Sequence, residues 1–245
     1  ATHSVLKDKI RFDLNFTASN LQNQYAPITD AAGFEGSLIG AAISANPTYP
    51  VRNADGKFFT PDENARYSSS FRNPVNMMEM IDDTDDINRY LGSISGTWTI
   101  VPELMYKANF GIDNSRSKRE TWLSRELLGY TGTQNFRGID VVAVTGNGRG
   151  VVQNQKLRSS LIEHTLTYDN KFGVHAFNLL GGFSYQTFKN YGYNDMAWGQ
   201  NDPNAMPGSL SSFANRLPGT FGDSTKYELQ SYFTRLNYSF NDKYL

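Results

Sequence analysis

Apolar side chains recur at every second position in several separate stretches of this chain. The clearest stretch is DKIRFDLNFTAS, whose even positions are apolar: Ile10, Phe12, Leu14, Phe16 and Ala18. A β-strand points successive side chains to opposite faces, so this pattern predicts strands with one apolar and one polar face. The connections between these stretches alternate between a few residues and dozens of residues. Long connections that recur on one side only are typical of a transmembrane β-barrel.

Six stretches of this kind are predicted as strands. They cover residues 8–19, 87–100, 104–113, 157–168, 174–188 and 227–240. Short turns are expected at 101–103, 169–173 and 241–243, and long loops at about 20–86, 114–155 and 189–225. The first loop is expected to hold a short helix within 29–45 and a tight turn at NADGK. In the fourth strand Leu161 and Ile162 compete for the same face, so the pattern leaves open which of them faces lipid.

Composition fits an all-β chain and excludes several classes of function. The 245 residues are 39% hydrophobic and 13% aromatic, include 21 glycines, and carry a formal charge of −1. Near-neutral charge argues against a nucleic-acid partner. Cysteine is absent, which removes disulfides and thiolate chemistry. The mean hydropathy of −0.51 is compatible with a barrel, because only alternate residues of its strands meet lipid.

Three longer stretches carry a family resemblance. They are NPVNMMEMIDDTDDINRYLGSISGTWTIVPELMYKANFGID, LTYDNKFGVHAFNLLGGFSYQ and YELQSYFTRLNYSFNDKYL. Together they resemble the barrel region of the SusC/RagA family of TonB-dependent outer-membrane transporters. The NPTYPVRNADG segment extends the likeness upstream, so it covers most of the chain.

This resemblance implies a barrel of about 22 strands in the outer membrane of a Gram-negative cell, with an N-terminal plug. It also implies a SusD-like lipoprotein partner, contact with TonB, and import of oligosaccharides or peptides. Residues 1–245 are then expected to be an internal β-barrel segment of about six full strands. The plug, the TonB-contacting region and the remaining strands are expected to lie outside it. Neither enzymatic activity nor a cofactor is expected.

Two groups of residues are the candidates for contact with solute or partner. Aromatic side chains in the long loops are expected to meet substrate or a lipoprotein partner: Trp122, Tyr130, Phe136, Tyr191, Tyr193 and Trp198. Polar side chains on the strands are expected to face the lumen: Arg89, Lys107, Asn109, Arg235 and Asn237. Packing of the aromatic rings within the loops, and a polar network between barrel wall and plug, are the alternatives for these two groups.

Catalytic and metal chemistry find little support in the sequence. The acidic run Asp82, Asp83, Asp85 and Asp86 offers the oxygen ligands that Ca²⁺ prefers. It lacks the spacing and the glycine of an EF-hand loop, so we expect a solvated charge cluster in a loop rather than a metal site. The three histidines do not cluster at ligand spacings.

Two other functions are compatible with the strand pattern. A soluble or surface-attached carbohydrate-binding β-sandwich would pack the same apolar faces against each other instead of against lipid. A passive porin would form a barrel without a plug or a TonB-contacting segment. The position of every long loop on one side favours a barrel over a sandwich.

Overall fold

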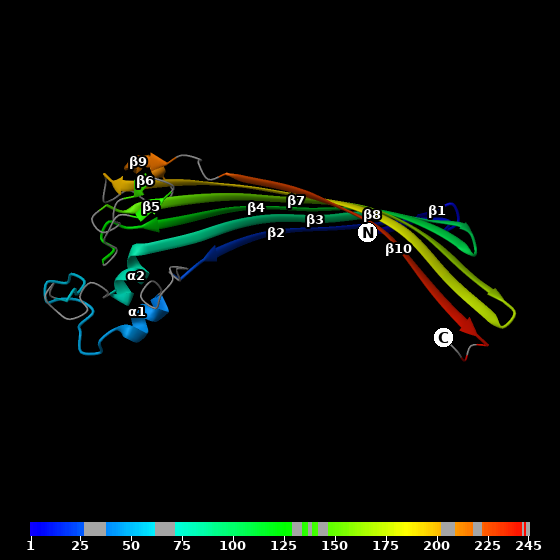
Figure 1. Ribbon diagram of the computed structural model, residues 1–245, viewed down its shortest axis with the longest axis horizontal. Helices are drawn as coiled ribbons and strands as arrows, with labels where there is room; N and C mark the ends of the chain where they lie inside the picture. The colour runs from blue at the N-terminus through cyan, green and yellow to red at the C-terminus, as the bar shows by residue number, and fades with distance from the viewer. Residues whose placement is uncertain are drawn as a thin grey trace.

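A single curved antiparallel sheet forms most of the molecule (Figure 1). The computed structural model describes residues 1–26, 38–61, 72–128, 134–136, 139–141, 147–201, 209–217, 222–241 and 243. The strands of the sheet follow the order β1-β2-β3-β4-β7-β8-β10, and β9 pairs with β8. All of these pairings are antiparallel between strands that are neighbours in the chain or nearly so. The predicted all-β antiparallel fold is therefore confirmed.

Six of the described strands are long. They are β2 (Ile10–Gln24), β3 (Ile81–Val101), β4 (Leu104–Leu123), β7 (Arg149–Phe172), β8 (His175–Gln200) and β10 (Asp223–Phe240). The short strands are β1 (Thr2–Val5), β5 (Gln134–Phe136), β6 (Ile139–Val141) and β9 (Phe213–Leu217), and the helices are α1 (Leu38–Ser44), α2 (Pro74–Met80) and the 3₁₀ helix η2 (Leu210–Ser212). None of the helices in the described part of the chain is both long and apolar enough to cross a membrane.

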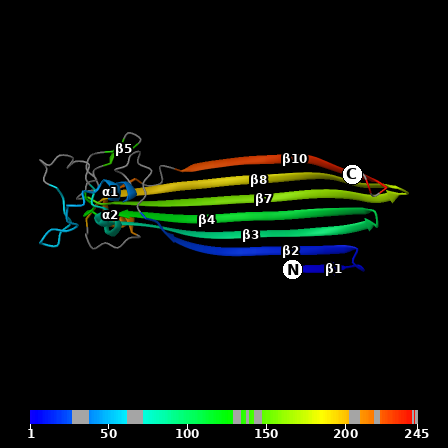
Figure 2. The same cartoon turned by 90° about the horizontal axis from the view of Figure 1, so that it is seen from below.

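The two ends of the sheet differ, as predicted. Tight connections join β3 to β4 and β7 to β8 at one end, whereas α1, α2 and β5 gather at the other (Figure 2). The turn expected at 169–173 is shorter than predicted, because β7 continues to Phe172 and β8 begins at His175. We call the two ends the turn end and the loop end.

The strands run much further into the loop end than the sequence pattern predicted. β4 continues to Leu123, β7 already begins at Arg149, and β8 continues to Gln200. The predicted loop boundaries at 86, 114, 155 and 189 are therefore wrong. The reason is physical: in these extensions polar and apolar side chains do not keep a regular alternation between the two faces, so the pattern that reveals a strand is lost.

Register divides the side chains of the sheet between two faces. Phe12, Ile94 and Phe110 belong to the apolar face, and across β7 and β8 this face continues through Ile162 and Tyr185. Many of its large side chains are exposed, including Phe16 at 64% and Leu236 at 63%. The register assigns Ile162 to the apolar face and Leu161, opposite Gly111, to the polar face. This settles the orientation that the sequence left open.

A small hydrophobic core at the loop end packs α1 and α2 against the end of β4. Its buried members are Ala41, Met77, Leu123 and Leu127. Asn73 caps α2 by accepting hydrogen bonds from the backbone N–H groups of Val75 and Asn76, and Pro74 occupies the first turn, where its missing N–H costs nothing. α1 lies within the helix predicted over 29–45, whose first part falls outside the described residues.

Buried Asn76 ties α2 to the segment that follows β4. Its side-chain N–H donates to the Glu126 carbonyl at 3.1 Å, and its side-chain oxygen accepts from the Leu128 N–H at 2.8 Å.

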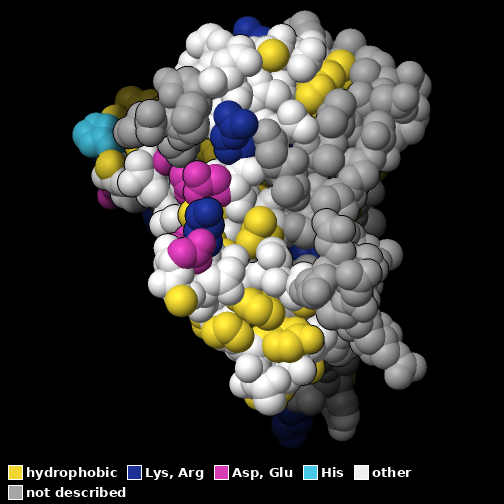
Figure 3. Space-filling view, turned by 90° about the vertical axis from the view of Figure 1, so that its left-hand side faces the viewer, with side chains coloured by type: hydrophobic (Ala, Val, Ile, Leu, Met, Phe, Trp, Pro, Cys, Tyr) yellow, Lys and Arg dark blue, Asp and Glu magenta, His cyan; other side chains and the backbone are white. Residues whose placement is uncertain are grey.

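The predicted NADGK turn is confirmed by the Gly56 N–H···O=C Asn53 hydrogen bond and by the left-handed φ of Gly56. Seen end-on, the described surface of the loop end shows acidic and basic side chains side by side and a group of hydrophobic ones (Figure 3).

Candidate functional site

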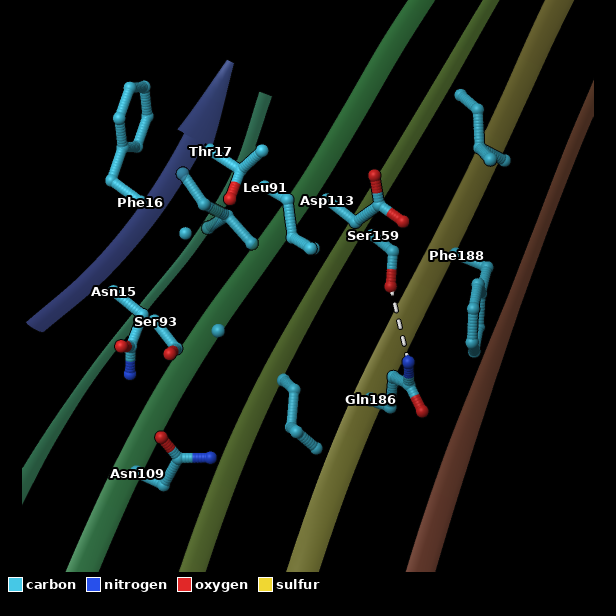
Figure 4. Close-up of a pocket in the computed structure, with 15 residues that line it drawn as sticks. Asn15, Phe16, Thr17, Leu91, Ser93, Asn109, Asp113, Ser159, Gln186 and Phe188 are labelled. Atoms are coloured by element: carbon cyan, nitrogen blue, oxygen red, sulfur yellow. Dashed lines mark hydrogen bonds between the residues drawn. The ribbon is translucent and has the colours of Figure 1, made fainter. Parts of the chain in front are cut away.

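A pocket of about 410 Å³ lies on the polar face of the sheet, across β2, β3, β4, β7 and β8 (Figure 4). Its polar side chains are Asn15, Thr17, Ser93, Asn109, Asp113, Ser159 and Gln186. Its apolar lining includes Leu91, Leu157, Leu161 and Phe188. The strands place these side chains together because alternate residues of five adjacent strands project to the same side.

Gly111 leaves room for this pocket. It stands on the polar face between Ser93 of β3 and Leu161 of β7. A Cβ added there would lie 3.6 Å from the Leu161 Cβ, which is an ordinary van der Waals contact. The missing side chain therefore creates space, and no close backbone packing demands glycine at this position.

The single acidic side chain in the lining is already paired. Arg89 donates to both carboxylate oxygens of Asp113, from Nε at 2.9 Å and from a terminal guanidinium nitrogen at 2.7 Å. This two-pronged geometry fits a carboxylate well and neutralises its charge. Gln186 Nε2 donates to Ser159 Oγ at 3.3 Å, and the other pocket amides and hydroxyls project from the neighbouring strands (Figure 4).

The lining combines neutral hydrogen-bonding groups with aliphatic and aromatic carbon. Sites of this composition suit uncharged polar solutes, because amides and hydroxyls replace water at polar atoms while apolar walls cover carbon. A strongly charged solute would find no unpaired partner of opposite charge among the lining residues.

The predicted lumen-facing residues all fall on the polar face by register. Asn109 lines the pocket, and Arg89 reaches it through Asp113. Lys107 is two residues from Asn109 on the same strand and face. Arg235 and Asn237 belong to β10, at the edge of the sheet and outside the pocket. Their register partners on β8 are Leu180 and Asn178.

The predicted loop aromatics are distributed differently from expectation. Trp122 and Trp198 belong to β4 and β8 and are 8% exposed, each within a small core at the loop end. Tyr191 and Tyr193 stand on β8, on the side of the sheet that carries the apolar band. The loop assignment of these four is wrong, because the strands extend further. Phe136 belongs to β5, and Tyr130 lies outside the described residues.

The acidic run is part of β3, so its expected loop position is also wrong. Asp83 and Asp85 point to one face and are buried, whereas Asp82 and Asp86 belong to the other face. Arg119 and Thr121 donate to Asp83, and Ser117 donates to Asp85. In the described part of the chain no three His, Cys, Asp or Glu side chains are grouped to hold a metal ion.

Most of the pocket is not predicted by the strand pattern, although the sequence contains a signal for it. Leu91, Leu157, Leu161 and Phe188 are apolar residues at positions that the alternation assigns to the polar face. These exceptions to the alternation lie on neighbouring strands, and the sheet brings their side chains together in one pocket. The sequence shows this irregularity directly only at Leu161 and Ile162, and the register that brings the four residues together is not visible from one strand.

In the described residues, an antiparallel sheet with one exposed apolar face, one polar face and its long connections at one end has the architecture of the wall of a transmembrane β-barrel. Curated relatives agree with this class. The chain is 27% identical over 246 residues to TonB-dependent receptor P26 of Formosa agariphila, with 98% of the chain and 22% of the relative aligned. It is 24% identical over 267 residues to TonB-dependent receptor SusC of Bacteroides thetaiotaomicron, with 99% of the chain and 23% of the relative aligned.

Solved structures show the same fold. The RagAB peptide transporter matches with a TM-score of 0.69 at 14% identity, over 98% of this chain and 25% of that one. The RagAB peptide importer in its open-open state gives a TM-score of 0.70. The chain thus spans about a quarter or less of the proteins it matches. The resemblance to part of a SusC/RagA-type TonB-dependent receptor is confirmed. No protein-family model matches the chain.

Proposed function

We propose that this chain supplies barrel wall and outer loops to a TonB-dependent importer of oligosaccharide or peptide nutrients in the outer membrane. The observation that carries the proposal is the neutral, partly apolar pocket on the polar face, which in a barrel of this type faces the lumen. In this proposal the chain forms a β-barrel segment of the receptor. The plug and the remaining strands belong to other parts of the same receptor, and TonB is contacted through its N-terminal region.

A SusD-like lipoprotein is the proposed partner at the loop end. The support is the similarity to SusC and to a structure named RagAB, together with the position of every long connection at that end (Figure 2). Because Trp122 and Trp198 are buried, we assign them a packing role at this end. Tyr130 and Phe136, from the connection between β4 and β7, remain the proposed contacts for substrate or lipoprotein.

Peptide and oligosaccharide are both compatible with the pocket. Each offers uncharged hydrogen-bonding groups that amides and hydroxyls can meet, and each offers carbon surface for Leu161 and Phe188. A carbohydrate-binding sandwich does not fit the described residues, where the second sheet holds only β5 and β6. Sandwich packing requires a full sheet against the apolar face.

Filling the pocket tests the proposal. In the whole receptor, Gly111→Phe places a ring in the space above Leu161, and we expect uptake of the cognate nutrient to fall by on the order of tenfold or more, the effect of an obstructed apolar subsite. Gly181→Phe is the matched control. Gly181 stands on the apolar face, and a Cβ added there meets nothing within 4 Å.

Uptake is measured with radiolabelled solute in cells that contain or lack TonB. Loss of import in both the Gly111→Phe strain and the TonB-deficient strain supports the proposal. Import that continues without TonB indicates a passive porin instead. Equal uptake by Gly111→Phe and Gly181→Phe receptors at equal surface abundance would remove the pocket from the solute path.

A further inference from the structure

Three basic residues face one another directly across three strands near the loop end. Arg158 of β7 is register partner to Lys189 of β8, and Lys189 is register partner to Lys226 of β10. In the next row towards the loop end, Lys156 of β7 is register partner to Arg116 of β4. Like charges directly opposite on neighbouring strands destabilise a sheet. Five cations in two adjacent rows therefore need an explanation.

Carboxylates compensate only part of this charge. Glu228 contacts Lys226, with 2.5 Å between Nζ and Oε1. Within the part of the chain that the structure describes, no carboxylate forms an ion pair with Lys156, Arg158 or Lys189. The side chains of Arg158 and Lys189 are exposed. The cluster therefore retains positive charge that an external anion can meet.

These cations surround a pocket of about 370 Å³. The lining residues that project to the same face as the cations are Lys156, Arg158, Lys189, Tyr191, Ser224 and Lys226. The hydroxyls of Tyr191 and Ser224 beside four cations give both charge and hydrogen-bond donors. This is the composition expected of a phosphate site, in which a guanidinium binds two oxygens and ammonium groups add point charges.

The cluster stands on the apolar face, not on the face that holds the solute pocket. Arg158 is four residues from Ile162 on the same strand and face, a distance of about 13 Å at the usual rise of a strand. Tyr185 is likewise four residues from Lys189. The cations thus lie just beyond the apolar band, at the level where the headgroups of a surrounding bilayer would lie.

We propose that this cationic pocket binds the phosphate of an anionic lipid headgroup at the loop-end surface of the membrane. A lipid fits better than free phosphate because the apolar band continues directly below the cations and offers Ile162 and Leu166 to its acyl chains, both more than 40% exposed. Basic side chains at a membrane surface attract anionic headgroups in this way. The inference rests on the membrane location in the proposed function, and it concerns the outside of the barrel, not the solute path.

The test uses the whole receptor chain purified in neutral detergent. Binding of phosphatidylglycerol and of diphosphorylated lipid A is measured by native mass spectrometry, with phosphatidylcholine as the zwitterionic reference. The variant Lys156→Gln/Arg158→Gln/Lys189→Gln removes the three cations that form no ion pair with a carboxylate. We expect its affinity for the anionic lipids to fall by on the order of a hundredfold, since each basic residue contributes severalfold at such a surface.

A matched variant, Lys7→Gln/Lys9→Gln/Lys57→Gln, removes the same charge from exposed positions elsewhere and should bind like the wild type. Arg158→Lys keeps the charge and should retain most of the binding. Unchanged anionic-lipid binding in the first variant overturns the proposal. The proposal is also overturned, in favour of a site for soluble anions, if the wild type binds anionic lipid no more tightly than phosphatidylcholine and low concentrations of inorganic phosphate displace the lipid.

Thermal stability of the first variant provides a second readout. Removing opposed like charges should leave the detergent-stable fold at least as stable as before. A large loss of stability would show that these cations have internal partners, which contradicts the proposal. Because lipid binding is measured without any solute, a failure of nutrient uptake leaves this result unaffected, and the two inferences are tested separately.

Discussion

Gly150 illustrates how one missing side chain shapes the loop end. A Cβ at this position would lie 2.5 Å from Cζ3 of the Trp122 ring and 3.0 Å from Leu210. Trp122 cannot easily yield, because it is buried against Phe213, with ring centroids 5.9 Å apart. We expect Gly150→Ala to cost about 1–3 kcal/mol through overpacking. Faster amide hydrogen exchange at Val151 and Val152 in the whole receptor measures the effect.

Gly192→Ala is the control for this prediction. Gly192 is also a strand glycine near the loop end, yet an added Cβ meets only the Asn154 carbonyl oxygen at 3.6 Å, an ordinary contact. Its exchange rates should match those of the wild type. If both variants exchange alike, Trp122 is not fixed by its neighbours as the structure indicates.

Individual residues also show where sequence reasoning succeeds and where it ends. Asn109 and Arg89 were assigned to the polar face by alternation alone, and the register agrees. The pocket partners of Asn109 cannot be predicted from its own strand, because Ser159 and Gln186 lie 50 and 77 residues further along the chain. One-strand periodicity gives the face of a residue but not its neighbours across the sheet.

Hydrogen-bonded polar pairs hold β3 to β4 where the apolar band has ended. Asp83 is 7% exposed and accepts from Arg119 Nε at 2.8 Å, from a second Arg119 nitrogen at 2.6 Å and from Thr121 Oγ1 at 3.1 Å. Ser117 donates to Asp85 at 2.6 Å in the same region. Cross-strand pairs of this kind stabilise a sheet that has no hydrophobic face to bury.

Asp83→Ala should therefore loosen the loop-end extension of these two strands. Its loss leaves Arg119 without its carboxylate partner, at a cost of about 1–3 kcal/mol for hydrogen bonds to a charged group. Hydrogen exchange at residues 81–86 should accelerate while residues 92–98 remain protected. Asp86→Ala, on the exposed face of the same strand, should change neither region. Equal effects of both variants would contradict the role of the Asp83 network.

The same element explains why strand ends were predicted poorly. The segment Asn114–Arg119 reads NSRSKR, without an apolar residue on either face. Its strand conformation comes from pairing with β3 and β7, not from local alternation. The portions of the strands that carry the exposed apolar band were predicted well because that band requires an apolar side chain at every second position. Their polar extensions carry no such requirement and read as loop.

At the scale of the whole molecule, the described sheet has two open edges. β10 pairs only with β8, and β1 covers only the first residues of β2. An unpaired strand edge leaves backbone N–H and C=O groups without partners, at a cost of several kcal/mol for each group in lipid. A barrel avoids this cost by closing, so the apolar face described here requires further strands at both edges when it meets a bilayer.

The 245-residue chain expressed alone should therefore fail to form a stable membrane barrel. After refolding into detergent, we expect no heat-modifiable band on gels and rapid proteolysis of β10, whereas the whole receptor gives a heat-modifiable, protease-resistant species. A third sample, the chain joined to the neighbouring strands of its own receptor, should recover resistance as the edges close. A heat-modifiable, monodisperse species from the isolated chain would mean that the two edges find partners within the chain or in a second copy. In that case the pairing of both sheet edges that a bilayer requires would not depend on further strands.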